Sequence, residues 1–281
     1  MSKKGVYETK LKNGTVSFRA SLTCSGRHIS LGSYDSEKKA HKAYVEGSAI
    51  LADKQGELYS IDRFEDISRG LTLYPQKAIM LMNLRDNGIY IAAPIYIYSN
   101  YFHYYLSESV HLTFDRDDLF YYARHRIMQR KGHYFVADYG MQVTITGRYG
   151  IRPYAVKGRD YVFVNGDDTD FRYNNISIIN PYHGVLREGE YGSYRYRALI
   201  HLNGNHTIGV YEDMTEAAIA YNKAVDACKN AGIDNSFPVN YIENLTGREY
   251  ADIYEKTELS KRLCEYLRSV KLSTASGNQQ S

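Results

Sequence analysis

Two groups of side chains in this sequence have types and spacings that suit ligand binding. The first is a pair of arginines, Arg19 and Arg197, each in an aromatic-Arg-Ala triplet. A guanidinium can hold a phosphate or the edge of a guanine through two parallel hydrogen bonds. The second group is rich in side-chain oxygen, the atom type that divalent cations prefer. Its members are Asp167, Asp168, Asp170, Asn174, Asn175 and His183.

Both groups also have an ordinary structural explanation. Arginines on the polar side of an antiparallel sheet are commonly solvated, and a Gly-Asp-Asp-Thr-Asp run is a common acidic turn. The helices and strands expected around these side chains decide between the two explanations.

The two arginines lie in an internal repeat, because residues 18–47 and 196–224 align in near register. We therefore expect one small domain to occur twice, towards the two ends of the chain. The matched residues are Gly26 with Gly204, Gly32 with Gly209, Tyr34 with Tyr211, Ala40 with Ala217, and Ala43-Tyr44 with Ala220-Tyr221.

Each copy predicts three strands followed by one helix. Apolar residues alternate with polar ones at 18–23 and 196–203, as in strands with one buried face. Ser25-Gly26 and Asn203-Gly204 supply hairpin turns, and the Gly-Val pairs at 5–6 and 184–185 open a third strand. Small residues then recur at helical spacing, with Asp35 and Asp213 as expected N-caps.

This pattern resembles the APETALA/ethylene-response-factor DNA-binding domain of plants and, more closely, its bacterial and phage relatives. The matching features are the Gly-Val opening, the aromatic-Arg-Ala strand, Leu31-Gly32 with Ile208-Gly209, and the Ala-x-x-Ala-Tyr helix. The resemblance implies that the polar face of each sheet lies in the DNA major groove. It implies these outward residues: Tyr7, Arg19, Ser21, Thr23, Arg27, His28 and Ser30 in the first copy, and Leu186, Arg195, Arg197, Leu199, His201, Asn205 and Thr207 in the second.

Charge is distributed unevenly between the copies. The net charge of +3 excludes a general polycation. Residues 1–57 hold ten Lys/Arg against six Asp/Glu, whereas residues 184–245 hold five against eight. We therefore expect the first copy to bind DNA more tightly, and the second to bind weakly or to serve partly as a scaffold or protein interface.

The middle of the chain is unusually rich in tyrosine, with 29 in the whole sequence. Residues 88–106 predict two strands with one tyrosine-rich side. Such a side suits either an interface or a hydrophobic core whose edge is in contact with water. Residues 52–83 have the polarity of a linker, and residues 115–131 predict a helix, followed by strands. That helix would end in a basic cluster able to contact phosphate or simply to match the helix dipole: Arg124, Arg126, Arg130 and Lys131.

Residues 161–180 resemble the core of the His-Asn-His homing-endonuclease family. The matches are Asn165-Gly166-Asp167, Asp170, Arg172 and Asn175-Ile176. This chain has Phe163 where the family has its general-base histidine, and Phe171 where it has the central asparagine. Because phenylalanine can neither accept a proton nor bind a cation, we expect a degenerate nuclease frame kept for DNA contact, spacing or assembly, with no catalytic residue, metal or cofactor.

The C-terminal residues 246–272 predict one amphipathic helix with Thr246 as cap and Glu249 at the capping-box position. It would dock on its own chain or pair two subunits in a homodimer, and the tail from 273 is expected to be disordered. Three scattered cysteines and the absence of an apolar leader or long apolar stretch predict a cytoplasmic, nucleoid-associated protein without membrane contact.

The sequence therefore predicts an α+β fold, with two small units of three-stranded antiparallel sheet plus one helix flanking a tyrosine-rich α+β middle domain. The expected segments are 1–57, 58–183, 184–245 and 246–281. The predicted function is sequence-specific binding of double-stranded DNA, as a transcriptional regulator or repressor of a bacterium, phage or mobile element. The alternatives are a homing-type nickase with displaced ligands and an inhibitor that binds another protein through the tyrosine-rich middle.

Overall fold

The computed structural model describes residues 3–10, 14–153, 155–233 and 235–277, the last five without their side chains. The chain forms two compact units. The first unit comprises Met1–Tyr149 and Phe163–Ile176, and the second comprises Gly150–Val162 and Ser177–Ser281. Both contain small antiparallel sheets and helices, which confirms the predicted α+β class.

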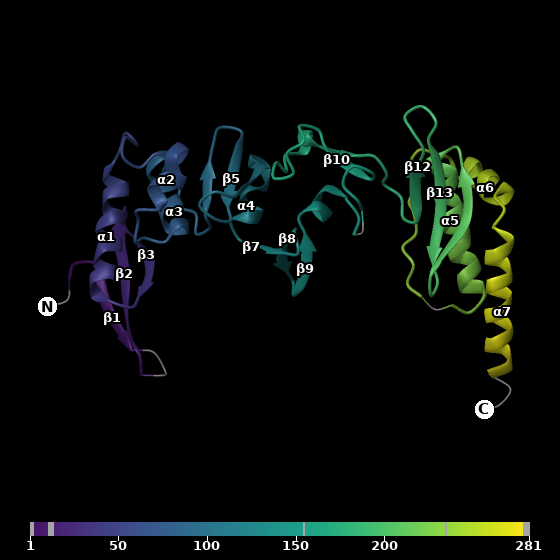
Figure 1. Cartoon of the computed structure of the whole chain (residues 1–281), viewed down its shortest axis with the longest axis horizontal. Helices are drawn as coiled ribbons and strands as arrows, with labels where there is room; N and C mark the ends of the chain where they lie inside the picture. Colours follow the sequence, from purple (N-terminus) through teal and green to yellow (C-terminus); the bar gives the residue numbers. More distant parts are fainter. Residues whose placement is uncertain (1–2, 11–13, 154, 234, 278–281) are drawn as a thin grey trace. The chain divides into compact units, whose positions relative to one another are not determined.

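The first repeat is the purple and blue part of Figure 1. It consists of β1 (Val6–Lys10), β2 (Val16–Cys24), β3 (Arg27–Tyr34) and α1 (Glu37–Ala52), with the strands in the order β1-β2-β3. Ser36, not the predicted Asp35, caps α1 by accepting from the N–H of Lys39. The Asp35 carboxylate instead binds Lys39 Nζ at 2.7 Å.

The second repeat has the same order of elements. β12 (Val185–Glu188), β13 (Arg195–His201) and β14 (Asn205–Tyr211) form the sheet, and α5 (Met214–Asn230) packs on it. The predicted cap is confirmed here, because Asp213 accepts from the N–H groups of Thr215 and Glu216. The repeat in the sequence thus corresponds to a repeat in the structure.

The two copies also share their irregularities. A β-bulge shifts the register after Ala20 in one copy and after Ala198 in the other. The extra residue is an apolar side chain buried against the helix, Leu31 or Ile208. A bulge bends and twists its strand, so both sheets acquire the same curvature at the same point.

A glycine at the start of each sheet lets the helix approach closely. A Cβ at Gly5 would lie 2.0 Å from the ring of Tyr44, and one at Gly184 would lie 2.1 Å from the ring of Tyr221. Small residues on the helix make the same approach possible. They are Ala40, Ala43 and Gly47 in α1, and Ala217, Ala220 and Ala224 in α5, all buried.

Residues 52–83, expected to be a polar linker, instead extend the core of the first repeat. After η1 (Ile61–Arg63) and α2 (Phe64–Ser68), α3 (Pro75–Asn87) packs against α1 and fully buries Leu81. The connection is fixed by the buried Glu46, whose carboxylate accepts from the N–H groups of Thr72 and Leu73. Polar composition was misleading because the segment still supplies several apolar side chains to the core of the first repeat, among them Ile61, Phe64, Leu73 and Ile79.

The middle of the chain contains two further three-stranded sheets and a two-stranded sheet. The sheets are β4 (Ile95–Ile97), β5 (Tyr101–Tyr105) and β6 (His111–Asp115), then β7 (Ile127–Arg130), β8 (His133–Asp138) and β9 (Met141–Thr144). The remaining elements are η3 (Thr146–Tyr149), β10 (Tyr161–Phe163), η4 (Tyr173–Asn175) and β11 (Ile176–Ile178), with β10 paired to β11.

The helix predicted over 115–131 is wrong beyond its first half. Only η2 (Arg116–Asp118) and α4 (Leu119–Tyr122) are helical, and the chain turns into strand β7 at Ile127. Ile127 pairs with Val136 of β8, and its side chain is buried. Burial of this residue in a sheet outweighs the helical propensity of the segment, as tertiary context often does.

The C-terminal helix predicted over 246–272 is two helices, α6 (Gly247–Lys256) and α7 (Lys261–Gly277). The capping box of Thr246 and Glu249 is confirmed. The break occurs where Ser260 binds the edge of β14, its N–H and hydroxyl donating to the carbonyls of Ile208 and Thr207. Within the described residues, the helices all lack the length and apolar character needed to cross a membrane.

We predict that Gly5→Ala destabilises the first repeat by about 2–3 kcal/mol, because a Cβ would overlap Tyr44 in addition to straining the left-handed backbone. Gly26→Ala is the matched control, since Gly26 has the same φ of 76° and open space around it. Urea denaturation followed by circular dichroism measures both variants. Equal losses for the two would show that the contact with Tyr44 is unimportant.

Candidate nucleic-acid interface

One face of the first sheet is free of helix α1 and carries the predicted arginine. Residues directly opposite in antiparallel strands share a face, and Arg19 is opposite Tyr7 on β1 and Ser33 on β3. Its neighbour Ala20 lies on the other face and is completely buried. Tyr7 is 59% exposed and Arg19 is exposed, and across the described parts of the chain no carboxylate pairs with Arg19. This face therefore presents a free guanidinium.

The remaining residues predicted for the first repeat differ in their exposure to solvent. Thr23 with His28 and Ser21 with Ser30 form opposite pairs in the same register, and all but Ser21 are exposed. Ser21 lies on the central strand at the bulge, where its N–H donates to Gly5, and it is 6% exposed.

Arg27 is exposed, as predicted, but it does not lie in the polar row of this face. It is opposite Cys24, one residue out of phase with the polar row, and its guanidinium lies 5.0 Å from the centre of the Tyr90 ring. Ser33, which was not among the predicted residues, also shares the face of Arg19. Leu31 at the bulge adds one residue to β3 and so reverses its alternation.

The exposed face of the second sheet contains every residue predicted for it. Arg197 is opposite Leu186 and Val210, and the further opposite pairs are Arg195 with Glu188, Leu199 with Thr207, and His201 with Asn205. Arg195, His201, Asn205 and Thr207 are exposed, and Arg197, Leu186 and Leu199 are partly buried. His201 Nδ1 lies 3.0 Å from Asn205 Oδ1.

The two faces differ in how their central arginine is paired. Glu188 Oε2 accepts from Arg197 Nη2 at 2.8 Å and from Nε at 3.2 Å. The equivalent of Glu188 in the first repeat is Thr9, which has no charge. The second sheet therefore offers an arginine that is already neutralised, and the first sheet offers one that is not.

The region similar to the His-Asn-His nuclease core is built around aromatic packing. Phe171 is 3% exposed and stacks on Phe114 with ring centres 5.7 Å apart. The rings of Phe163 and Phe171 are nearly perpendicular, with centres 5.5 Å apart. The two positions that would hold the base and the asparagine of a nuclease thus hold core residues.

The acids and amides of this region hold the loop in shape. Asp170 forms a bidentate pair with Arg172 at 2.9 and 2.6 Å and also accepts from Asn165. Burial opposes ionisation of Asp170, yet hydrogen bonds from Arg172 hold its pKa below the usual value. Asn175 donates to the carbonyls of Asp167 and Asp170. Across the described ranges, no three His, Cys, Asp or Glu side chains form a group that could hold a metal.

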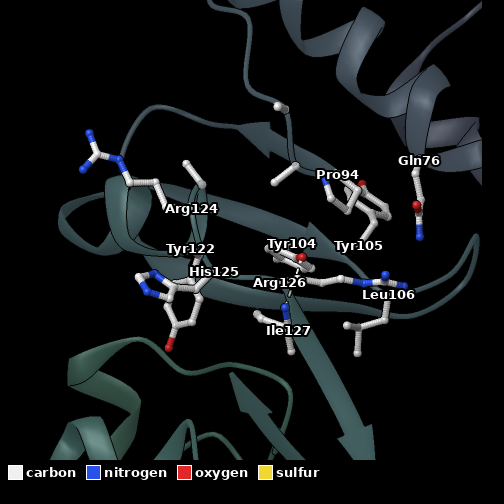
Figure 2. A pocket seen from close by; sticks show the side chains of 13 residues that line it. Gln76, Pro94, Tyr104, Tyr105, Leu106, Tyr122, Arg124, His125, Arg126 and Ile127 are labelled. Atoms are coloured by element: carbon white, nitrogen blue, oxygen red, sulfur yellow. Dashed lines mark hydrogen bonds between the residues drawn. The ribbon is translucent and has the colours of Figure 1, made fainter. Parts of the chain in front are cut away.

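The basic residues after α4 are exposed. Arg124 and Arg126 line a pocket of about 280 Å³ in the first unit, together with Gln76. Figure 2 shows the Arg126 side chain extending across this pocket towards Gln76, whereas the guanidinium of Arg124 points away from it. Arg130 and Lys131 lie at the β7–β8 turn and are also exposed.

The tyrosine-rich side of the middle sheet is a stack of rings. The opposite side, with Phe102 and Phe114, is completely buried. On the tyrosine side the ring centres of Tyr98 and Tyr101 are 4.7 Å apart, and those of His103 and His111 are 3.9 Å apart. Burial, and then the neighbouring His111, lower the pKa of His103 to about 4.

We predict that this imidazole makes the first unit less stable in acid. His103 stays neutral while the unfolded chain takes up a proton below its ordinary pKa of 6.5, so stability is lost as pH falls from about 6.5 to 4. The loss should be about 2 kcal/mol, less than the full shift because the ring is only partly buried. His103→Phe should flatten the pH dependence of urea unfolding. His133→Gln, an exposed control, should not; if it has the same effect, the assignment to His103 fails.

The chain was also compared with known proteins. A scan of protein-family models, a search of curated proteins and a search of solved structures each found no match to it.

Proposed function

We propose that this chain binds double-stranded DNA in a sequence-specific manner, through the exposed sheet faces of its two repeats, and acts as a transcriptional regulator or repressor. The observation that carries the proposal is the repeated placement of an arginine. Arg19 and Arg197 occupy the same register position on the free face of the same three-stranded sheet.

The composition of the first face supports contact with a groove. On the β3 side of Arg19 and along β2 the neighbours are short and polar, among them Ser30, Ser33 and Thr23, whereas the larger Tyr7 lies opposite Arg19 on the edge strand β1. The short side chains allow the backbone of β2 and β3 to approach the duplex, so that the guanidinium extends beyond them. A bidentate arginine on guanine is the commonest specific contact in the major groove.

The two repeats contribute unequally in this proposal. The first has the free arginine and the excess of basic residues, so it supplies most of the binding energy. The second adds affinity through its high effective concentration once the first is bound, provided that the spacing of the two sites on DNA matches.

The first test is Arg19→Ala. A binding site is selected from random duplexes, with and without magnesium, and affinity is measured by fluorescence anisotropy. Arg19→Ala should weaken specific binding by about 1–3 kcal/mol, and Arg197→Ala should cost less because that arginine is paired with Glu188. Lys38→Ala is the matched control, since it removes one positive charge from the helix side of the same repeat.

Three results would contradict the proposal. Equal effects of Arg19→Ala and Lys38→Ala would leave only general charge attraction. Strand breaks that require magnesium would favour the nickase. Binding without any sequence preference would favour the protein-binding alternative.

The second test concerns the ion pair of the second repeat. Glu188→Gln should raise DNA affinity by about 0.5–1 kcal/mol, because it removes a negative charge and releases Arg197 for phosphate or base contact. The gain should disappear when Arg197 is already alanine. A gain that persists in the Arg197→Ala background would show that Glu188 acts only through net charge.

A further inference from the structure

We propose that the second unit contains a phosphate-binding site, formed by Arg152 and His183 in a pocket beside the exposed face of the second sheet. Where the phosphate belongs to DNA, this inference rests on the proposed function. Where it belongs to a free small molecule, it does not.

The pocket has a volume of about 400 Å³. One side is formed by Arg152, Pro153, Ala155, Arg159 and Asp160, and another by residues of the second sheet. It includes part of the face assigned above to DNA, because Leu186, Leu199, His201 and Asn205 all line it. A group bound here would therefore lie directly beside the DNA-facing residues of the second repeat.

The acid in this pocket is fully occupied by other partners. Asp160 is 2% exposed and accepts from Arg159 at 3.1 and 2.7 Å. Its carboxylate also accepts from the N–H of Val156 and from the side-chain amide of Asn180. Arg159 and Asp160 thus neutralise each other, and Asp160 has little capacity to pair with a second cation.

Arg152 is the cation that this arrangement leaves without an ion-pair partner among the described residues. It is partly buried and donates from Nη2 to the carbonyl of Asn180 at 2.9 Å, and within the described chain no carboxylate forms an ion pair with it. Burial lowers the pKa of Arg152, and the negative charge of Asp160 only partly opposes this change. The pKa of His183 is lowered by burial and then by the nearby Arg152. A guanidinium and an imidazole therefore lie close together in a pocket without a free acid.

Arg152 is partly buried, and the nearby carboxylate of Asp160 is already paired with Arg159, so part of the desolvation cost of Arg152 remains. A bound anion would lower that cost. Phosphate fits this site better than a carboxylate does, because its oxygens point in several directions and can accept from donors on different elements. Arg152 and His183 come from the segments before the sheet, and His201 and Asn205 come from β13 and β14. Arginine is also the side chain best suited to bind phosphate through two nitrogens.

The test uses the full chain and two probes, inorganic phosphate and the selected DNA duplex. Inorganic phosphate should raise the melting temperature of the wild type, with its affinity measured by calorimetry. Arg152→Gln should weaken phosphate binding by about tenfold or more, as expected for the loss of a charged hydrogen-bond donor. Arg152→Lys should retain part of the binding. Arg248→Gln, at an exposed position on α6, should bind phosphate as the wild type does.

The DNA measurements identify the source of the phosphate. If the site holds a backbone phosphate, Arg152→Gln weakens binding to all duplexes about equally and reduces the slope of log affinity against log salt by about 1. If it holds a free phosphorylated molecule, DNA binding is unchanged and phosphate binding alone is lost.

Should Arg152→Gln fail to fold by circular dichroism, His183→Gln serves as the second variant in both assays. The inference is overturned if phosphate neither stabilises the wild type nor binds it, and if no variant changes the salt slope. Its failure is distinct from failure of the proposed function, because Arg19→Ala tests groove binding in the other unit.

Discussion

The close approach of a helix to a three-stranded sheet determines most of what each repeat can do. The tyrosine rings of Tyr44 and Tyr221 lie where a side chain on Gly5 or Gly184 would be, and alanines line the rest of the contact. Because the helix covers one face completely, the other face is left for solvent or a ligand. The arginine at the middle of that free face is therefore placed by packing on the opposite side of the sheet.

The two copies share this arrangement and differ in their electrostatics. Glu188 occupies the position of Thr9 and neutralises the arginine of the second sheet. Beside that sheet, Arg152 is a cation without an ion-pair partner among the described residues. The first repeat thus presents its positive charge on the sheet itself, and the second presents it in an adjacent pocket.

The elements of the repeats could be predicted from the sequence because their signals are local. Alternating apolar residues, turn glycines and small residues at helical spacing all occur within a few positions of one another. The predictions failed where pairing between strands or packing between elements decides the conformation. Ile127 is a strand residue because Val136 pairs with it, and the C-terminal helix is broken because Ser260 binds the edge of β14. The bulge at Leu31 changed the facing of Ser33, which a simple alternation could not reveal.

The outer side of each repeat's helix is covered differently, by α3 in the first copy and by α6 and the segment leading to it in the second. Lys223 of α5 links the two helices of the second copy, because its ammonium donates to the carbonyls of Tyr254 and Thr257 at the end of α6. A three-stranded sheet and one helix form a small core, and the fraction of surface that a chain buries on folding rises with its size. The covering helix enlarges the core of each repeat, so the duplicated segment and the segment that packs as one core are different lengths of chain.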